Sequence, residues 1–248
     1  MNLVLFEPNE IGAPLPLQDP RASHILDVLR RKPGDLFDIG LINGPRGKAS
    51  VVEVGSISLT LTFSWSDTPP PLSPLTLLIG LPRPQTARKI LQETAALGVS
   101  ALHFITSERG EPSYASSTLW SSGEWRRHVR DGAAQAFCTR LPDVSFGHSF
   151  CETLPKLSKD TLRIALDNYE ASSALEAMLK HLAQPSSVTK SEKHIVLAIG
   201  SERGWASTER AALRKNDFAL AHLGSRVLRT ETAVVAAVAI VKSSLGWL

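Results

Sequence analysis

A proline-rich stretch divides this chain, and it constrains the fold more than any other feature of the sequence. Four prolines fall within positions 69–74, in the run Thr68-Pro69-Pro70-Pro71-Leu72-Ser73-Pro74. Proline fixes one backbone torsion and lacks an amide proton, so such a run excludes helix and favours an extended, semi-rigid connection. We therefore expect two domains, residues 1–68 and 75–248, joined by a linker at residues 69–74. A chain of 248 residues is long enough for both.

The segment before the prolines has the pattern of a small β domain. Short strands are expected at residues 3–6, 35–42, 48–54 and 56–63, with one helix after the first. The turn residues Asn43-Gly44-Pro45-Arg46-Gly47 separate two of these strands and predict a hairpin. Repeated short strands with tight turns are typical of a small β-barrel.

After the prolines, apolar runs alternate with helical patterns. The runs at 75–80, 99–105, 162–166, 195–199 and 218–223 predict strands, and helices are expected over a face from 90 to 97 that ends at Gly98 and near 124–137, 171–182 and 231–245. The last helix is apolar nearly all round and is expected to be buried. The alternation predicts an α/β domain with a largely parallel sheet covered by helices.

Composition excludes several classes of protein. Hydrophobic residues make up 43% and charged residues 21% of the chain, which fits a globular protein rather than a disordered one. Cys138 and Cys151 form no CxxC pair and have no histidines at metal-ligand spacing, so neither a disulfide framework nor a metal site is expected. The longest apolar stretch, 233–241, is far shorter than the roughly 20 residues that cross a bilayer. With no signal-peptide pattern at the amino terminus, we expect a cytoplasmic protein that does not enter a membrane.

Two basic segments are candidates for phosphate contact. The net charge is only +3, so affinity for a polyanion would depend on local clusters. Within residues 19–31, a helix capped by Asp19 would place Arg21, His24 and Arg31 on a different face from its apolar residues. The run Arg83 to Lys89 lies at a strand-to-helix junction, where anions settle in open α/β sheets. Ordinary hydrated surface cations are the alternative in both places.

Two turns could frame a pocket. Residues 199–205 run from an apolar strand into a glycine-bearing turn, which lets the backbone approach a ligand closely. This turn matches neither the phosphate-binding nor the dinucleotide-binding glycine pattern, so a nucleotide hydrolase and a Rossmann dehydrogenase are not supported. In the second turn, Thr230 or Thr232 can cap a helix that holds Glu231 in its first turn. Ordinary connecting loops are again the alternative.

Taken together and in this order, these segments resemble the small-subunit ribosomal RNA uridine-N3 methyltransferases of the SPOUT superfamily. The most specific match is the run Leu223 to Ala233, LGSRVLRTETA, which fits the family block LG-x-R-[IV]-LR-T-E-T-A throughout. The resemblance covers nearly the whole chain. Supporting matches are Arg21 and His24 with Val28-Leu29-Arg30, Lys89 with Leu97-Gly98-Val99, Gln135 with Arg140 and Pro142, and Ile199-Gly200.

The resemblance implies a PUA-like β-barrel followed by a methyltransferase domain with a C-terminal trefoil knot. It implies a homodimer that methylates uridine N3 of small-subunit (16S) ribosomal RNA, free or within the small ribosomal subunit, using S-adenosyl-L-methionine and no metal. The residues that it suggests for S-adenosylmethionine are Leu166, Gly200, Glu202, Leu223, Gly224, Val227, Leu228, Thr232 and Ala233. Those that it suggests for RNA are Arg21, His24, Arg30, Arg83 and Lys89.

Methylation of uracil N3 makes two demands on the site. N3 lies on the pairing edge and carries a proton, so the base must be unpaired and the proton must leave. Within this resemblance we expect Arg229 to stabilise the negative charge that spreads onto the uracil oxygens. Glu231 is the expected proton acceptor, and Glu202 is the alternative.

The chain departs from the family pattern beside the expected pocket. The family's loop is close to IGPEGG-[FW]-S, whereas this chain has Ser201 for Pro, Arg203 for the first paired Gly and Ala206 for the usual Ser. Ala96 and Ala134 replace two usual glutamates. Two alternatives therefore stay open: methylation of another RNA site, and a non-catalytic RNA-binding or assembly protein whose pocket Arg203 obstructs.

Overall fold

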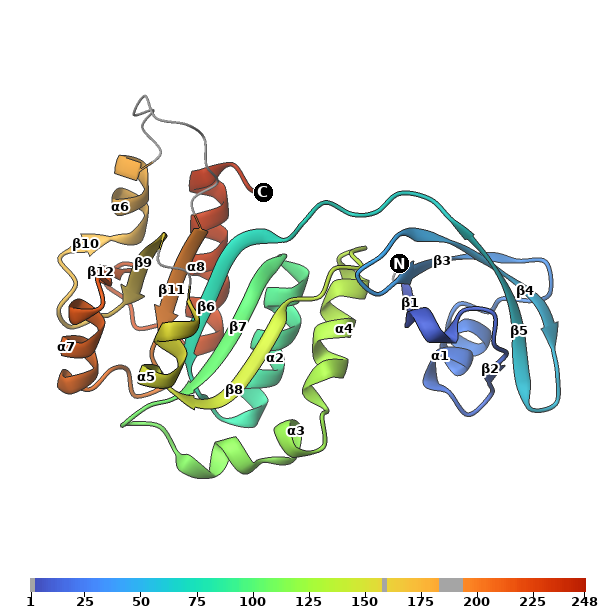
Figure 1. Cartoon of the computed structure of the whole chain (residues 1–248), viewed down its shortest axis with the longest axis horizontal. Helices are drawn as coiled ribbons and strands as arrows, with labels where there is room; N and C mark the ends of the chain where they lie inside the picture. Colours follow the sequence, from blue (N-terminus) through green and yellow to red (C-terminus); the bar gives the residue numbers. More distant parts are fainter. Residues whose placement is uncertain (1–2, 158–159, 183–193) are drawn as a thin grey trace. The chain divides into compact units, whose positions relative to one another are not determined.

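The computed structural model of the chain describes residues 3–157, 160–182 and 194–248 (Figure 1). The chain separates into two compact units. The first comprises Met1–Pro71 with Ala133–Leu141, and the second Leu72–Gly132 with Pro142–Leu248. Within the described ranges, no helix combines the length and the apolar character needed to cross a membrane.

A curled five-stranded sheet forms the frame of the first unit. Its strands are β1 (Val4–Phe6), β2 (Leu15–Pro16), β3 (Leu36–Leu41), β4 (Arg46–Val54) and β5 (Ser58–Trp65), in the order β1-β3-β4-β5-β2. β1 is parallel to β3, and the other pairs are antiparallel. The hairpin predicted at residues 43–47 is confirmed, since it joins β3 to β4.

The predicted small β-barrel is confirmed only in part, because the sheet is curled but open. Among the described strands, β1 and β2 are the two edges of the sheet and do not pair with each other. β2 is only two residues long and ends at Pro16, which has no amide proton to donate to a further strand. The sheet is therefore half of a barrel.

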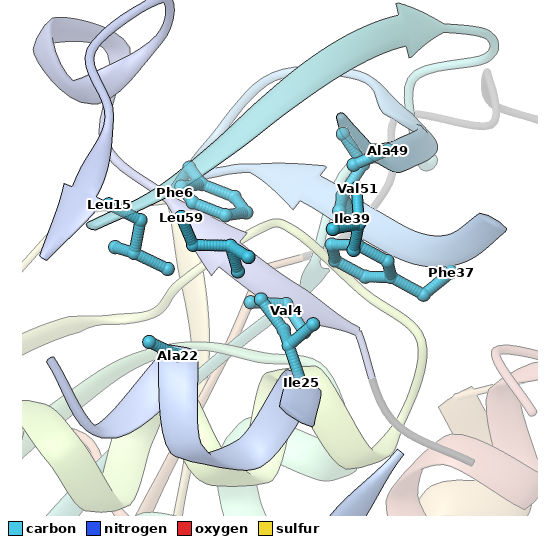
Figure 2. Packing of buried hydrophobic residues seen from close by; sticks show 10 residues of the cluster. All are labelled: Val4, Phe6, Leu15, Ala22, Ile25, Phe37, Ile39, Ala49, Val51 and Leu59. Atoms are coloured by element: carbon cyan, nitrogen blue, oxygen red, sulfur yellow. The ribbon is translucent and has the colours of Figure 1, made fainter. Parts of the chain in front are cut away.

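One short helical segment packs against this sheet. α1 (Pro20–Ser23) begins as predicted, because the Asp19 carboxylate accepts the Arg21 amide at 2.8 Å. A single π-helical turn, His24–Val28, follows it, and Arg30 then adopts a left-handed conformation with φ of 52°. The regular helix expected to reach residue 31 is therefore shorter. Figure 2 shows the buried cluster of this unit, whose members are Val4, Phe6, Leu15, Ala22, Ile25, Phe37, Ile39, Ala49, Val51 and Leu59.

Residues 133–141 belong to the first unit although they follow it by some sixty positions in the sequence. They are the end of helix α4 (Trp125–Gln135) and the turn after it. Thr139 donates its hydroxyl to the Gly44 carbonyl at 2.6 Å, and the Asn43 side chain accepts the Leu141 amide at 3.0 Å. The Leu3 amide donates to the Ala134 carbonyl at 3.1 Å. The unit is thus assembled from two separate stretches of chain.

A seven-stranded sheet forms the centre of the second unit. Every pair in it is parallel, in the order β10-β12-β9-β11-β6-β7-β8. The strands are β6 (Ser73–Gly80), β7 (Val99–Thr106), β8 (Asp143–Ser149), β9 (Thr161–Leu166), β10 (Ser173–Ala174), β11 (His194–Ile199) and β12 (Ala219–His222). The predicted α/β domain with a parallel sheet is confirmed. β8 and β10, at the two edges, were not predicted.

Helices cover the faces of this sheet (Figure 1). The main ones in the second unit are α2 (Pro84–Ala96), α4, α6 (Leu175–Leu182), α7 (Ser207–Lys215) and α8 (Thr230–Leu245), with short α3 (Thr118–Ser121) and α5 (Phe150–Thr153). α8 packs against α2 and α6. The expectation that α8 is buried all round is wrong: Val234 and Val238 are fully buried, whereas Thr232 and Ser243 are exposed. Only one of its sides faces the neighbouring elements.

Candidate functional site

The carboxyl ends of β9, β11 and β12 meet at one edge of the parallel sheet, and the loops that follow them enclose a cavity of about 270 Å³. Crevices of this kind, outside the carboxyl ends of parallel strands, are where open α/β sheets bind ligands. The two turns singled out from the sequence, 199–205 and 223–233, both contribute to its lining. The full lining is Leu166, Asp167, Asn168, Tyr169, Ile199, Gly200, Ser201, Glu202, Arg203, Gly204, Trp205, Leu223, Arg226, Val227, Leu228, Thr230 and Ala233.

The turn after β11 closes tightly on itself, and glycine makes this possible. A Cβ atom added to Gly200 would lie 3.0 Å from the backbone of Gly204, and Gly204 itself has a left-handed φ of 66°. The Gly204 amide donates to the Ser201 carbonyl at 2.8 Å. On the neighbouring strand, a Cβ added to Gly80 would lie 2.4 Å from the Ser201 nitrogen. Both glycines therefore permit close backbone contacts that no other residue allows.

A buried ion pair and an indole fix the turn after β9. Asp167 accepts a hydrogen bond from Arg210 Nε at 2.7 Å, with side chains only 2% and 7% exposed. Burial alone would raise the pKa of Asp167, but the hydrogen bonds from Arg210 and from two backbone amides hold it below its ordinary value. The buried Trp205 donates its indole N–H to the Leu166 carbonyl at 3.0 Å. These contacts tie the turns after β9 and β11 to each other.

The cavity combines an unpaired polar atom with exposed apolar surface. The hydroxyl of Ser201 is buried and has no hydrogen-bond partner among the described residues. Tyr169 and Val227, which also line the cavity, are 75% and 84% exposed. Buried polar groups are ordinarily paired, and exposed apolar side chains that line one cavity together can mark a ligand-binding groove. Both features fit a ligand that carries polar groups and an apolar ring.

Seven of the nine residues suggested for S-adenosylmethionine line this cavity. They are Leu166, Gly200, Glu202, Leu223, Val227, Leu228 and Ala233. Gly224 and Thr232 do not line it. Gly224 donates its amide to His222 Nδ1 at 3.1 Å, and Thr232 is exposed on α8.

Neither of the two expected catalytic side chains lines the cavity. Arg229 is exposed at the N-cap of α8, between Leu228 and Thr230, which do line it. Glu231 lies in the first turn of the same helix, with its Oε1 3.4 Å from Lys89 Nζ. A hydrogen bond from its own backbone amide, together with Lys89, lowers the pKa of Glu231 despite partial burial. Its carboxylate is therefore held ionised and already has a cation beside it.

Glu202 and Arg203 occupy the outer part of the glycine turn. Glu202 Oε1 accepts the backbone amide of Arg83 at 2.9 Å, which links this turn to the start of α2. The Arg203 side chain is exposed, and its carbonyl accepts a hydrogen bond from Arg109 at 3.2 Å. Although Arg203 contributes to the lining, the cavity of about 270 Å³ stays open beside it.

The residues expected to contact RNA differ in their exposure and in the hydrogen bonds that they already make. Arg21 donates all five of its guanidinium N–H groups within the first unit: to Asp19, to Glu10 and to the Leu5 carbonyl. This saturation favours a structural role over the expected phosphate contact. His24 is half-buried and Arg30 is exposed. In the second unit, Arg83 and Lys89 are exposed at the start of α2.

Sequence reasoning missed several residues at the cavity. Asp167, Asn168, Tyr169 and Trp205 all line it. Asp167 follows directly after a predicted strand. Polar residues in that position reach the ligand-binding edge of a parallel sheet, so the position itself could have predicted Asp167 as a site residue. Among the described residues, no group of three or more His, Cys, Asp or Glu side chains is placed to hold a metal ion.

Comparisons with known proteins agree with this geometry. The family described as "RNA methyltransferase domain" matches residues 68–242. A ribosomal RNA small subunit methyltransferase E of Treponema pallidum is 34% identical, with 97% of this chain and 90% of that protein aligned. The ribosomal RNA small subunit methyltransferase E 1 of Borreliella burgdorferi is 27% identical, with 99% of each aligned.

Solved structures with the same fold extend over both units. The ribosomal RNA small subunit methyltransferase E of Neisseria gonorrhoeae, solved bound to S-adenosyl methionine, superposes with a TM-score of 0.76 at 24% identity, covering 97% of each chain. A probable rRNA-methyltransferase of Porphyromonas gingivalis gives a TM-score of 0.76 at 21% identity, covering 98% of this chain and 99% of the other. The parallel sheet and the curled sheet are therefore a shared architecture.

Proposed function

This chain belongs to the RNA methyltransferase family, among relatives named ribosomal RNA small subunit methyltransferase E, and on that basis we propose that it methylates N3 of a uridine in 16S ribosomal RNA. The methyl donor in this proposal is S-adenosylmethionine. One observation carries it: the cavity lined by both the Gly200 turn and the turn that begins at Leu223. Its place of action would be the cytoplasm.

The residues around the cavity fit this donor. Leu166, Val227 and Leu228 offer apolar surface to an adenine ring, and the Ser201 hydroxyl offers an unused hydrogen bond to a polar group. The N. gonorrhoeae relative is itself described as bound to S-adenosyl methionine. When bound, the donor supplies an activated methyl group on a sulfonium. The protein has to position the base, stabilise charge and receive a proton.

Glu202 is the better candidate for the proton acceptor. Its side chain lines the cavity, whereas Glu231 does not and is paired with Lys89. A general base works best when its pKa lies near the working pH, and the pKa of Glu231 is shifted in the opposite direction. In this proposal Glu231 positions Lys89 at the edge of the site.

Arg229 is proposed to stabilise the charge that spreads onto the uracil oxygens as the N3 proton leaves. It adjoins two lining residues, Leu228 and Thr230, and its own side chain is exposed and so accessible to a bound base. A fixed cation beside a developing oxyanion lowers the barrier without needing to reorganise. His24, Arg30, Arg83 and Lys89 are proposed to contact the RNA backbone.

The finer architecture is also part of the proposal. We place the first unit among the PUA-like domains and the second among the SPOUT domains with a C-terminal trefoil knot. Support for a knot comes from the strand order: β12 follows β11 in sequence but lies beyond β9, after which α8 returns to pack against α2. Knotted chains are rare among folds.

A homodimer is proposed from the uncovered side of α8. Ala236 and Ala239 are partly exposed there, between the exposed residues Thr232 and Ser243. A second copy of the chain packed on this side would bury the small residues and bring further groups towards Arg229.

The proposal is tested by incubating the protein with S-adenosylmethionine labelled in its methyl group and small ribosomal subunits from cells that lack the enzyme. We expect label at N3 of one uridine in the 16S RNA, and loss of that label in the Arg229→Ala variant while calorimetry still detects S-adenosylhomocysteine binding. Label in another RNA would redirect the substrate assignment. Absence of any S-adenosylhomocysteine binding would favour a non-catalytic RNA-binding protein.

A further inference from the structure

The first unit contains a cavity of its own, with a volume of about 380 Å³. It lies against β3, β4 and β5 and against the turn that follows α4, all of them parts of that unit. The side chains that matter here are two aromatic residues, Trp65 and Phe137, and two ion pairs, Arg46 with Asp67 and Lys48 with Asp38. Nothing in the methyl-transfer site uses them.

Trp65 is the end of an aromatic stack. Its ring lies 5.9 Å from that of Phe63 at an interplanar angle of 12°, and Phe63 meets Phe6 edge to face at 5.3 Å. Of these three rings only Trp65 lines the cavity. Gly47 lies directly opposite Trp65 on β4, so no side chain of the partner strand covers the indole. A side chain could not be accommodated there, because a Cβ on Gly47 would lie 2.1 Å from the Ser64 carbonyl oxygen.

Phe137 reaches the cavity from a strained position. It follows the last turn of α4 with a left-handed φ of 54°, a conformation that favours glycine and disfavours a bulky side chain. Its ring is only half-buried and lines the cavity, so burial in the core does not explain the choice. The Arg46 guanidinium donates to the Phe137 carbonyl at 3.3 Å and helps to hold this turn. Backbone strain of this kind is concentrated at ligand-binding and other functional sites.

The charges at the cavity are balanced. Arg46 is paired with Asp67, and Lys48 Nζ lies 2.7 Å from Asp38 Oδ1. A phosphate would meet two carboxylates as well as two cations, so this is not a site of net positive charge. The same set offers both donors and acceptors around an aromatic surface, and the edge of a nucleobase requires that combination.

We propose that this cavity binds an unpaired nucleobase of the RNA, which stacks on Trp65 and meets the paired charges with its edge. Its volume falls within the range of roughly 300–1,000 Å³ that is usual for small-molecule pockets. The inference rests on the proposed function for its substrate class, since it takes the ligand to be RNA. It adds a second point of attachment, separate from the base that is methylated.

The test compares two single-stranded oligoribonucleotides of equal length, one of mixed sequence and one without bases, by fluorescence anisotropy. Trp65→Leu keeps an apolar side chain but removes the aromatic face, and we expect about a tenfold loss of affinity for the strand with bases. The abasic strand should bind the variant and the unmodified protein alike. Equal affinity of both proteins for the strand with bases would overturn the assignment, and so would an equal loss for the abasic strand.

Phe137→Gly guards against a misfolded variant. Glycine adopts the left-handed conformation without strain, which offsets part of the burial lost with the ring, so the variant should keep a cooperative thermal transition while its binding of the strand with bases weakens. Ile57→Ala is the matched control, because Ile57 is 79% exposed in the same unit and does not line the cavity. Full RNA affinity in Phe137→Gly would contradict the proposed role of the ring. Adenosine monophosphate that binds more tightly than the strand would make this a free-nucleotide site, and would likewise overturn it.

Failure of this inference is distinguishable from failure of the proposed function. S-adenosylhomocysteine binding, measured by calorimetry, should be the same in all three variants and in the unmodified protein. If the unmodified protein binds no S-adenosylhomocysteine, the proposed function fails, whatever the strands show. If it binds S-adenosylhomocysteine and Trp65→Leu leaves RNA affinity unchanged, only the cavity of the first unit is wrongly assigned.

Discussion

Lys89 and Glu231 face each other from α2 and α8, with Lys89 Nζ 3.4 Å from Glu231 Oε1. The sequence suggested separate roles for them, in RNA binding and in proton transfer. Their pairing constrains both, because a carboxylate with a lowered pKa and a cationic neighbour is a weak base.

Glu231→Gln should therefore retain turnover within about tenfold of the unmodified protein, whereas Glu202→Gln should lose at least about a hundredfold. The Lys89 side chain is 61% exposed, so loss of the pair should lower the free energy of unfolding by less than about 1 kcal/mol. Single-turnover methyl transfer and urea unfolding measure the two effects. If Glu231→Gln is inactive but binds S-adenosylhomocysteine normally, then Glu231 and not Glu202 is the proton acceptor.

Ser201→Ala removes a buried hydroxyl that has no hydrogen-bond partner among the described residues. Stability of the free protein should stay the same or rise slightly, because no protein hydrogen bond is lost. Affinity for S-adenosylhomocysteine should fall by roughly threefold to tenfold if the hydroxyl bonds to it. Calorimetry and thermal melting separate the two. Unchanged affinity would show that the hydroxyl does not contact the ligand.

Gly200→Ala places a Cβ atom 3.0 Å from the Gly204 backbone, which cannot move aside as a flexible side chain would. We expect a loss of about 1–3 kcal/mol in the free energy of unfolding, together with weaker S-adenosylhomocysteine binding. Gly44→Ala is a milder comparison, since the atoms nearest to its Cβ belong to the side chain of Leu41 and not to backbone. Normal ligand binding by Gly200→Ala would show that the turn tolerates expansion.

Asp167→Asn removes the buried carboxylate that pairs with Arg210 and leaves that cation only the more exposed and more distant Glu170, at 3.7 Å, at a cost of up to about 3 kcal/mol at neutral pH. The pKa of Asp167 is lowered in the folded protein, so the ionised form stabilises the fold at pH values above its ordinary 3.8. That stabilisation is lost as the pH falls through the folded-state value. The difference in stability between variant and unmodified protein should therefore shrink in acid.

Urea unfolding at neutral pH and in acid tests this pH dependence. Glu176→Gln is a matched control, because Glu176 and Lys180 form an ion pair whose side chains are 60% and 70% exposed. It should change stability little at either pH. A stability difference for Asp167→Asn that grows in acid would contradict the sign derived above.

Ala239→Glu tests the proposed homodimer. Ala239 is partly exposed on the uncovered side of α8, so a glutamate there can reach water in a monomer but would be buried between two copies. Sedimentation should show a monomer, with methyl transfer lost and the melting temperature of the chain little changed. A dimer of unchanged stability would place the interface elsewhere.

The local hydrophobic pattern predicted the central strands of the parallel sheet well and its edge strands poorly. β6 and β11 are continuous apolar runs buried on both faces, which periodicity identifies. β8 reads DVSFGHS, with polar residues throughout, and pairs only with β7 at the edge of the sheet. Its formation depends on that neighbouring strand and not on its own composition.

Pro74 is predicted to lie in the linker, yet it lies inside β6. The register between β6 and β7 is irregular there, so the amide proton that proline lacks is not needed.

For the site, the sequence identified the turns but not their neighbours. The run from Leu223 and the turn at Gly200 were recognised because they match a family block and a glycine pattern. Asp167 and Tyr169 were missed because their place at the cavity depends on β12 being inserted next to β9, a long-range choice of strand order. The ion pair between Lys89 and Glu231 joins residues from two helices, which no local pattern reveals.

The assembly of the first unit from residues 1–71 and 133–141 has a consequence for biosynthesis. A chain emerging from the ribosome exposes its amino-terminal strands first, but the hydrogen bonds that Gly44 and Asn43 make with Thr139 and Leu141 must wait for later residues. The strands nearest the start of translation are therefore completed only after part of the second unit has been synthesised. Cutting the gene at the proline codons would leave an amino-terminal fragment without these contacts.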